Sequence, residues 1–393
     1  MCYVRNVSVD LAVEEFAAVM REHKKKNDEP SMGEALRSAE RERWIEAIRE
    51  EINKLTARGV FRFINKEQLP PGKKAFPLHI VLKCKRNHFG KITRYKANKA
   101  RCVFDGSQMR KNVDYYESYA QVVEFTNVRL LVSVAHAKKR ELRSYNIVLA
   151  FTLARPQVQT FVRFRNLDGI VDGIEPGQIA EVLWNLYGDV AAPYSWYQTL
   201  KPALLELGFV EAGGHPCVMI RKVSLLIDGK EVDSVIMLTI YVDDLIVAAS
   251  GNAEFIWFED KLGSKFEYTT QGRLKYCLGV EFVLSDDSVY LTLTQRGYAK
   301  KILEKFGMTE CRGAKTPVDP TAKLSLADCL AEVKADLQKE YRANVGSLQY
   351  LSIWTRPNLS CAVSILSRYL HAQDLSIYLL LIELCNISKK QLN

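Results

Sequence analysis

Two adjacent aspartates, Asp243 and Asp244, interrupt an apolar run that extends over residues 235–249. Such a run predicts two buried β-strands, and neighbouring side chains on a regular strand point to opposite faces of a sheet. Both carboxylates can therefore serve one site only at a turn, and we expect a tight hairpin here. Asp-Asp is a poorer hairpin sequence than Asn-Gly or Asp-Gly, so something other than turn stability selects it.

The aspartate pair is suited to a divalent cation. Two carboxylates held close together repel each other, and their pKa values diverge unless a cation offsets the charge. Mg²⁺ is a hard ion that proteins bind through one or two carboxylates plus substrate phosphates. A solvated loop tip between two core strands is the alternative, and the motif alone leaves it open.

The charge pattern favours a polyanionic partner. The chain has 393 residues and a net charge of +9, with Lys or Arg at eight positions between residues 83 and 101. Such side chains release counterions when they neutralise phosphates, which favours RNA or DNA, and a basic solubilising surface is the alternative. The nine cysteines include no Cys-x-x-Cys pair, so we expect reduced thiols and no zinc site.

The sequence predicts neither export nor membrane insertion. Charged residues follow the N-terminus closely, unlike a signal peptide. The apolar run at 377–382 is far shorter than the ~20 residues that a membrane span needs. We therefore expect an intracellular protein, in the cytoplasm or the nucleus, with no membrane partner.

Hydrophobic periodicity predicts a mixture of helices and strands, and so an α+β fold. The 3.6-residue spacing indicates helices at 34–55, 126–140, 195–207, 255–266, 296–306, 341–354 and 359–370. Short apolar runs bounded by turn residues indicate strands at 60–64, 79–82, 100–104, 146–151, 217–226, 277–284 and 289–293, and a turn at 228–229.

The sequence Tyr-Val-Asp-Asp at 241–244 resembles the reverse transcriptases of copia-type retrotransposons, and the likeness runs from about residue 44 to about residue 370. Each match is weak alone, and their order and spacing carry the assignment. The chain is thereby identified as similar to the RNA-dependent DNA polymerase region of a Pol polyprotein, diverged and truncated. The matching segments are 96–108, 113–123, 146–151, 186–188, 196–197, 276–279, 295–298, 306–308, 316–317, 341–351 and 355–359.

The resemblance implies a right-hand polymerase of the α+β class, with fingers, palm and thumb and an antiparallel palm sheet backed by helices. It implies a poorly ordered N-terminal segment at 1–32. Fingers are expected at 33–140 with an insertion at 156–195, palm at 141–155 and 196–290, thumb at 291–310, and a truncated connection towards a missing RNase H at 311–393.

The resemblance also implies a role for each matching side chain. The expected partners are an RNA template, a DNA primer and a dNTP, with Mg²⁺ or Mn²⁺ as the cofactor. No oligomeric state follows from the motifs. The residues are Asp243 and Asp244 for the metal, Asn146 at the position of a further family aspartate, Arg101 and Lys99 for the triphosphate, Phe151 for exclusion of ribonucleotides, Tyr241 for the nucleotide, and Cys277, Leu278 and Gly279 as the primer grip.

Asn146 is the departure from the family that matters most. In this chemistry two metal ions bridge the primer hydroxyl and the triphosphate, and acidic ligands from both palm motifs hold them. An amide carries no charge to offset a divalent cation, so we expect an incomplete two-metal site and weak or lost activity. A sequence error, or a conservative change that keeps activity, is the alternative.

Three further departures put other contacts in question. Residues 189–194 lack the polar and basic run that follows Leu-Tyr-Gly in the family. Residues 96–101 resemble a small duplication of Lys-Ala-Arg that could displace Arg101. Residues 374–393 match nothing in the family.

We therefore expect a reverse-transcriptase domain that transfers a nucleotide from a dNTP to a primer 3′-hydroxyl and is impaired at Asn146. One alternative is a non-catalytic nucleic-acid-binding remnant of the same fold, which would bind hybrid duplex in a salt-dependent way without extending it. The other is a non-functional retroelement fragment that folds poorly. Primer extension and a thermal melt distinguish the three.

Overall fold

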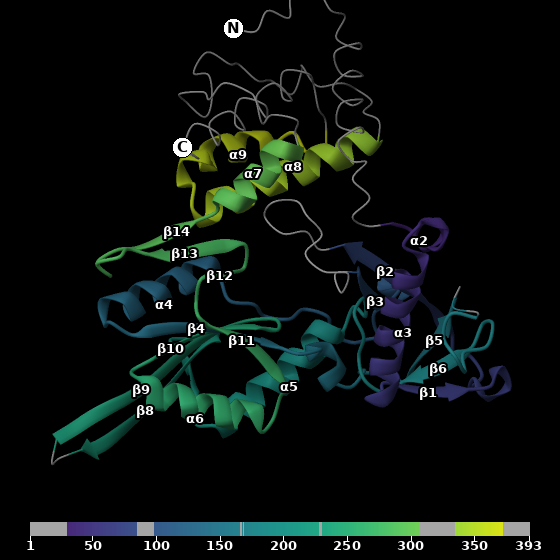
Figure 1. Cartoon of the computed structure of the whole chain (residues 1–393), viewed down its shortest axis with the longest axis horizontal. Coiled ribbons are helices and arrows are strands. Elements are labelled where there is room, and N and C mark those ends of the chain that lie inside the picture. The colour runs from purple at the N-terminus through teal and green to yellow at the C-terminus, as the bar shows by residue number, and fades with distance from the viewer. Residues whose placement is uncertain are drawn as a thin grey trace, which may run out of the picture. The chain divides into compact units, whose positions relative to one another are not determined.

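The computed structural model describes residues 30–84, 98–165, 167, 169–227, 230–305 and 335–371 (Figure 1). The chain divides between Leu274 and Lys275 into two compact units, and each is described by itself. Several expectations fall outside the described residues: the N-terminal segment up to residue 29, the basic residues at 85–97, the turn at 228–229, the motifs at 306–308 and 316–317, and everything from residue 372 onward.

A five-stranded sheet covered by a long helix forms one half of the first unit (Figure 1). Its strands run in the order β1-β6-β5-β2-β3, and β2 pairs with β5 in parallel while the other pairs are antiparallel. Trp44, Ile48 and Ile52 of the helix are buried in one core with the sheet. The elements are α2 (Met32–Arg37), α3 (Arg41–Ala57), β1 (Phe61–Ile64), β2 (Ala75–Cys84), β3 (Asn98–Phe104), β5 (Thr160–Phe164) and β6 (Ile179–Val182).

The single helix expected at 34–55 is two helices. Ser38 adopts extended backbone, and its hydroxyl donates to the carbonyl oxygen of Ala35 at 2.7 Å. A serine hydroxyl that bonds a nearby backbone carbonyl competes with the helix, which explains the break that periodicity alone did not reveal. The α2 helix begins in turn with a capping box between Ser31 and Glu34.

A six-stranded antiparallel sheet with helices forms the other half of the first unit. Its strand order is β11-β4-β10-β9-β8-β7. The elements are α4 (Phe125–Ala137), β4 (Glu141–Ile147), α5 (Ala192–Glu206), β7 (Val210–Ala212), β8 (His215–Ile227), β9 (Lys230–Tyr241), β10 (Asp244–Ala249), α6 (Asn252–Gly263) and β11 (Tyr268–Arg273). The expected α+β fold with a helix-backed antiparallel sheet is confirmed.

The α4 and α6 helices cover opposite faces of this sheet, and β10 is buried from Leu245 to Ala249. On the α6 face, the ring of Tyr145 meets Phe258 edge-on at 5.3 Å. On the other face, Tyr241 stacks on Phe125 at the start of α4, with ring centroids 6.4 Å apart. Because residues directly opposite each other in a sheet share a face, the register of Asp244 with Tyr241 and with Asn146 places all three on the α4 face.

The strand expected at 146–151 ends earlier, at Ile147. Leu149 takes up a positive φ of 54°, and residues Ala150–Leu153 form the 3-10 helix η4. The chain therefore leaves the sheet directly after Asn146 and Ile147. Phe151 lies on η4, outside the strand that the apolar run predicted.

The described residues of the second unit form a small antiparallel sheet and three α-helices. The expected strand at 277–284 is a hairpin, because Leu278 and Gly279 both have positive φ, as a two-residue turn between twisted strands requires. The Tyr341 hydroxyl on α8 donates to the carbonyl oxygen of Leu366 on α9 at 2.9 Å. The elements are β12 (Tyr276–Cys277), β13 (Val280–Leu284), β14 (Leu291–Thr294), α7 (Arg296–Lys305), α8 (Ala335–Trp354), η6 (Pro357–Leu359) and α9 (Ser360–Ser367).

Within the described ranges, the helices are all too short or too polar to cross a bilayer.

Two glycines allow β3 and the segment at 186–189 to meet backbone to backbone. Gly188 has a φ of +91°, and a Cβ there would lie 2.0 Å from the carbonyl oxygen of Phe104. A Cβ at Gly106 would lie 2.3 Å from the carbonyl oxygen of Gly188. The Phe104 N–H donates to the carbonyl oxygen of Tyr187 at 2.7 Å. This contact fixes Tyr187 beside β3.

We expect Gly188→Ala to lower the free energy of unfolding by roughly 3 kcal/mol or more, since the methyl group collides with backbone and the backbone is left-handed. Gly72 is the matched control, because its φ is +78° and a Cβ there meets nothing within 4 Å. Gly72→Ala should cost only about 1 kcal/mol. Urea denaturation measures both, and equal costs would contradict the close approach.

Candidate active site

The hairpin expected at the aspartate pair is present, with a shifted turn. Tyr241 pairs with Asp244, so the two central turn residues are Val242 and Asp243, and Asp244 is the first residue of β10. Val242 has a φ of 57°, a rare conformation for a β-branched residue that costs about 1–3 kcal/mol. The pair therefore converges because one aspartate is in the turn and the other begins the strand.

Two buried donors hold this strained turn. The indole Nε1 of Trp196, on α5, donates to the carbonyl oxygen of Val242 at 2.7 Å. The backbone N–H of Ile147 donates to the carbonyl oxygen of Asp243 at 2.8 Å. Trp196 is buried and packs edge-on against Phe266, with ring centroids 5.4 Å apart. Both turn carbonyls are thus fixed by neighbouring elements.

Asn146 bridges the two aspartates. It lies directly opposite Asp244 in the sheet, and its Nδ2 lies 3.1 Å from Oδ2 of Asp243 and 2.9 Å from Oδ1 of Asp244. Ionised carboxylates only accept hydrogen bonds, so the amide nitrogen and not its oxygen faces them. Asn146 and the adjacent aspartates, which lie 97 and 98 positions away in sequence, therefore converge on one point.

The charges at this point are only partly offset. Burial raises the pKa of the Asp244 carboxyl, the hydrogen bond from Asn146 lowers it, and the neighbouring Asp243 charge raises it. The amide contributes N–H dipoles but no net charge. In this chain hydrogen bonds hold the two carboxylates together.

The residues present fit one hard cation better than two. Two half-buried carboxylates are what Mg²⁺ uses together with waters and substrate phosphates. Nowhere in the described ranges do three His, Cys, Asp or Glu side chains group as metal ligands. A second ion that required a third carboxylate would lack it, because Asn146 stands there.

Arg101 and Phe151 both contact one tyrosine, Tyr187. The Arg101 guanidinium lies over the Tyr187 ring at 5.1 Å from its centroid, and the Phe151 ring meets it edge-on at 5.1 Å. Burial raises the pKa of Tyr187, the nearby Asp243 charge raises it further, and Arg101 lowers it. These three side chains therefore lie together near Asp243. Arg101 is thus not displaced from Tyr187 and Phe151.

Tyr187 was missed as a site residue by sequence reasoning. Its Leu-Tyr-Gly segment matches a motif, but the tyrosine itself carries no chemistry that marks it out. The position of its ring depends on the glycine after it, whose positive φ and close approach to Phe104 only the structure shows.

The remaining candidates are placed as follows. Tyr241 is half-buried beside Phe125. Lys99 lies on β3 opposite Lys83, and its side chain is not among those described. The primer-grip candidates lie in the second unit, where Cys277 is buried and the Tyr350 hydroxyl donates to the carbonyl oxygen of Leu278.

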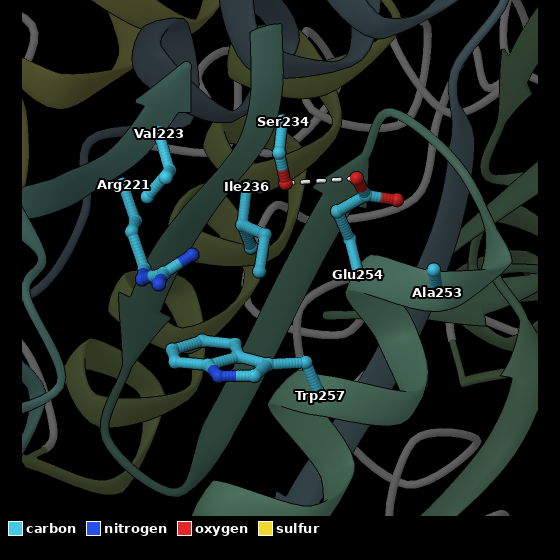
Figure 2. A pocket seen from close by; sticks show the side chains of 7 residues that line it. All are labelled: Arg221, Val223, Ser234, Ile236, Ala253, Glu254 and Trp257. Carbon is cyan, nitrogen blue, oxygen red and sulfur yellow. Dashed lines mark hydrogen bonds between the residues drawn. The ribbon is translucent and has the colours of Figure 1, made fainter. Parts of the chain in front are cut away.

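A cavity of about 220 Å³ lies on the opposite face of the palm-like sheet (Figure 2). Figure 2 shows Ser234 donating to Glu254, at 2.8 Å, and Arg221 beside Trp257, whose ring centroid lies 3.8 Å from the guanidinium carbon. Ile236 lines this cavity and pairs with Ala249, which places it on the α6 face. The cavity is therefore separate from the aspartate site, which is on the α4 face.

Asp189 fixes the start of the helix that carries Trp196. Its Oδ1 accepts from the Ala191 N–H at 2.8 Å, at the beginning of α5. The side chain is buried, and burial raises the pKa of Asp189 from 3.8 to about 6, while hydrogen bonds from the backbone N–H groups of Ala191 and Ala192 lower it. The helix start is thus sensitive to the charge of this acid.

The antiparallel sheet and the paired aspartates at its hairpin define a polymerase palm, and comparison with known proteins agrees. Residues 60–320 match the family model for reverse transcriptase (RNA-dependent DNA polymerase), so the chain belongs to that family. It corresponds to the reverse-transcriptase region of retrotransposon Pol polyproteins, and the resemblance drawn from the motifs is confirmed.

Several curated relatives are retrovirus-related Pol polyproteins. That of transposon TNT 1-94 of Nicotiana tabacum is 27% identical over 343 residues, covering 86% of this chain and 25% of the relative. That of transposon RE1 of Arabidopsis thaliana is 30% identical over 344 residues, covering 86% and 22%. This chain thus spans about a quarter of the length of these relatives. A solved foamy viral protease-reverse transcriptase in complex with double-stranded DNA aligns with a TM-score of 0.46 and 14% identity, covering 88% of this chain and 48% of that one.

We expect Trp196→Phe to loosen the hairpin that carries Asp243, because the Val242 carbonyl loses its donor at a cost of about 1–2 kcal/mol. The Ile147 amide should then exchange with solvent faster, as followed by hydrogen exchange. Trp257→Phe is the control, since it makes the same change in a half-buried tryptophan on the α6 face. Unchanged exchange in Trp196→Phe would contradict the role of the indole.

We expect Asp189→Asn to stabilise the chain at pH 7.5. The folded-state pKa lies above the ordinary value, so folding is favoured below about pH 4 and is penalised increasingly as pH rises towards 6. The difference between the pKa of about 6 and the ordinary value of 3.8 lowers the free energy of unfolding at high pH by at most about 3 kcal/mol. Asparagine keeps an acceptor for Ala191 and removes the buried charge.

Thermal melts between pH 4 and 8 test this expectation. The advantage of Asp189→Asn should vanish near pH 4, whereas Asp189→Ala should be less stable than Asp189→Asn at both ends because it lacks the acceptor. A natural chain more stable than Asp189→Asn at pH 7.5 would show that the charge itself stabilises the helix start.

Proposed function

We propose that this chain is the polymerase domain of a copia-type Pol polyprotein, which transfers a nucleotide from a dNTP to a primer 3′-hydroxyl on an RNA template, with reduced activity. The observation that carries the proposal is the convergence of Asn146, Asp243 and Asp244 at one hairpin. The contacts of Tyr187 with Arg101 and Phe151 near Asp243 support it.

Asp243 and Asp244 would hold the divalent cation, Mg²⁺ or Mn²⁺. When bound, the cation helps to deprotonate the primer hydroxyl and offsets charge on the transferred phosphoryl group. The chain's own residues supply the rest. Arg101 would bind the triphosphate through charge-assisted hydrogen bonds, with Lys99 on the same strand. Phe151 would lie under the sugar and exclude a 2′-hydroxyl, and Tyr187 would hold both Arg101 and Phe151 in place.

Asn146 is the reason for the reduced activity. Its N–H groups face the carboxylates, so cation binding requires the amide to give up both hydrogen bonds and turn its oxygen inward. Even then, the site has two negative charges where an acid at 146 would provide three. We infer weak binding of one cation and a poor site for a second.

The remaining assignments follow the family pattern. The five-stranded sheet would belong to the fingers (33–140 and 156–195) and the six-stranded sheet to the palm (141–155 and 196–290). The hairpin at 277–279 would be the primer grip and α7 part of the thumb (291–310). RNA templates and dNTPs are found inside cells, in the cytoplasm or the nucleus, so the enzyme would act there.

A non-catalytic nucleic-acid-binding role is the second candidate, and one observation favours it. Because Asn146 satisfies both carboxylates by hydrogen bonds, the folded site needs no cation to hold it together. Such a chain could keep a template-primer duplex in a salt-dependent way without extending it.

Primer extension on an RNA template with a DNA primer tests the proposal, comparing the natural chain with Asn146→Asp in Mg²⁺ and in Mn²⁺. We expect the variant to extend on the order of 100-fold faster, since it restores a residue that acts as part of a unit. Asp244→Asn, made in the Asn146→Asp background, should abolish extension and serves as the control.

Three results are distinguishable. Extension by the natural chain at the rate of Asn146→Asp would contradict the inference about Asn146. Template-primer binding without extension by either chain would favour the non-catalytic role. A chain that neither melts cooperatively nor binds would overturn both candidates.

A further inference from the structure

A small polar cavity of about 130 Å³ lies between the segment that precedes α4 and the start of β8. Its polar lining comes from Tyr119, Gln121, Glu124, Asn127 and His215, over an apolar floor that includes a buried valine and a buried cysteine. The volume is several times what one water molecule needs.

The cavity is on the same face of the sheet as the aspartate site. Val218, which lines the cavity, pairs with Thr239, and Thr239 pairs with Ile246. Ile246 is two positions from Asp244 on the same strand, so they share the α4 face. The Val123 N–H donates to the carbonyl oxygen of Ile240 at 3.0 Å, which anchors the cavity wall directly beside Tyr241.

Two lining side chains are available to a ligand. Tyr119 is 74% exposed, which is unusual for so large an aromatic ring. Gln121 is half-buried, and its amide makes no hydrogen bond within the described part of the chain. The other polar pair is already engaged, since Nδ2 of Asn127 lies 3.3 Å from Nδ1 of His215. An aromatic face and an amide with both donor and acceptor thus flank one opening.

We propose that this cavity binds one unpaired nucleobase of the nucleic acid held at the aspartate site, with the base stacked on Tyr119 and its edge bonded by the Gln121 amide. The inference rests on the proposed function, because it takes the bound polymer to be nucleic acid. The Glu124 carboxylate at the same rim disfavours a phosphate there, so a neutral base fits better than the backbone.

The chemistry also specifies which base. Every base has a face that can stack on an aromatic ring, so stacking on Tyr119 selects no sequence. A carboxamide forms paired hydrogen bonds to adenine through one donor and one acceptor. A base can stack on Tyr119 and reach the Gln121 amide only when it has left the base stack, which favours a single-stranded overhang over a duplex. We therefore expect a preference for adenine.

The test compares two template-primers that share one duplex and differ only in a 5′ template overhang of adenines or its absence. Fluorescence anisotropy gives both affinities for the full chain at one salt concentration. We expect the overhang to improve the affinity. Tyr119→Leu and Gln121→Leu should each lower the affinity for the overhang substrate by about fivefold to tenfold. Binding of the blunt duplex should not change.

Tyr116→Leu is the matched control, because Tyr116 is 58% exposed in the same segment and does not line the cavity. It should leave the overhang gain intact. A thymine overhang should bind the natural chain less tightly than adenine, and Gln121→Leu should abolish this difference. Thermal melts verify that each variant is folded.

Several results would overturn the inference. An overhang that adds no affinity would do so while leaving the proposed function standing, as would an equal loss in Tyr116→Leu and Tyr119→Leu, which would indicate unspecific stacking along the segment. Failure of the natural chain to bind either nucleic acid would overturn the proposed function and this inference together.

Discussion

The hydrogen bonds from Asn146 to Asp243 and Asp244 are the interaction on which the site depends. They join β4 to the hairpin and hold the two like charges close together. An acid at 146 would repel both aspartates until a cation bound, whereas the amide relieves that repulsion at once. These hydrogen bonds would have to break before a cation could bind to both carboxylates, which is the reason for the weak cation binding proposed above.

Two sets of contacts elsewhere in the first unit position the residues of this site. Asp189 starts α5, and α5 positions Trp196, whose indole holds the strained carbonyl of Val242. Gly188 lies against the backbone of Phe104, which positions Tyr187 for Arg101 and Phe151. Residues 186–196 thus supply contacts that position both parts of the site.

The sequence predicted the hairpin, the sheet and most helices because apolar periodicity and the aspartate pair are local signals. It placed Asn146 with the aspartates through a resemblance and could not predict that the amide would donate to both. The break at Ser38 depends on one side-chain hydrogen bond and the early end of β4 on the positive φ of Leu149, and periodicity records neither. The turn at Val242 and the role of Tyr187 depend on contacts distant in sequence, so no local pattern could reveal them.

Binding of Mn²⁺, measured by electron paramagnetic resonance in the presence of template-primer and dNTP, tests the central claim most directly. The natural chain should bind Mn²⁺ weakly and with a stoichiometry below that of Asn146→Asp, which should approach the two ions that the chemistry uses. Equal stoichiometry and affinity in the two chains would contradict the claim that the Asn146 amide takes the place of a cation between Asp243 and Asp244.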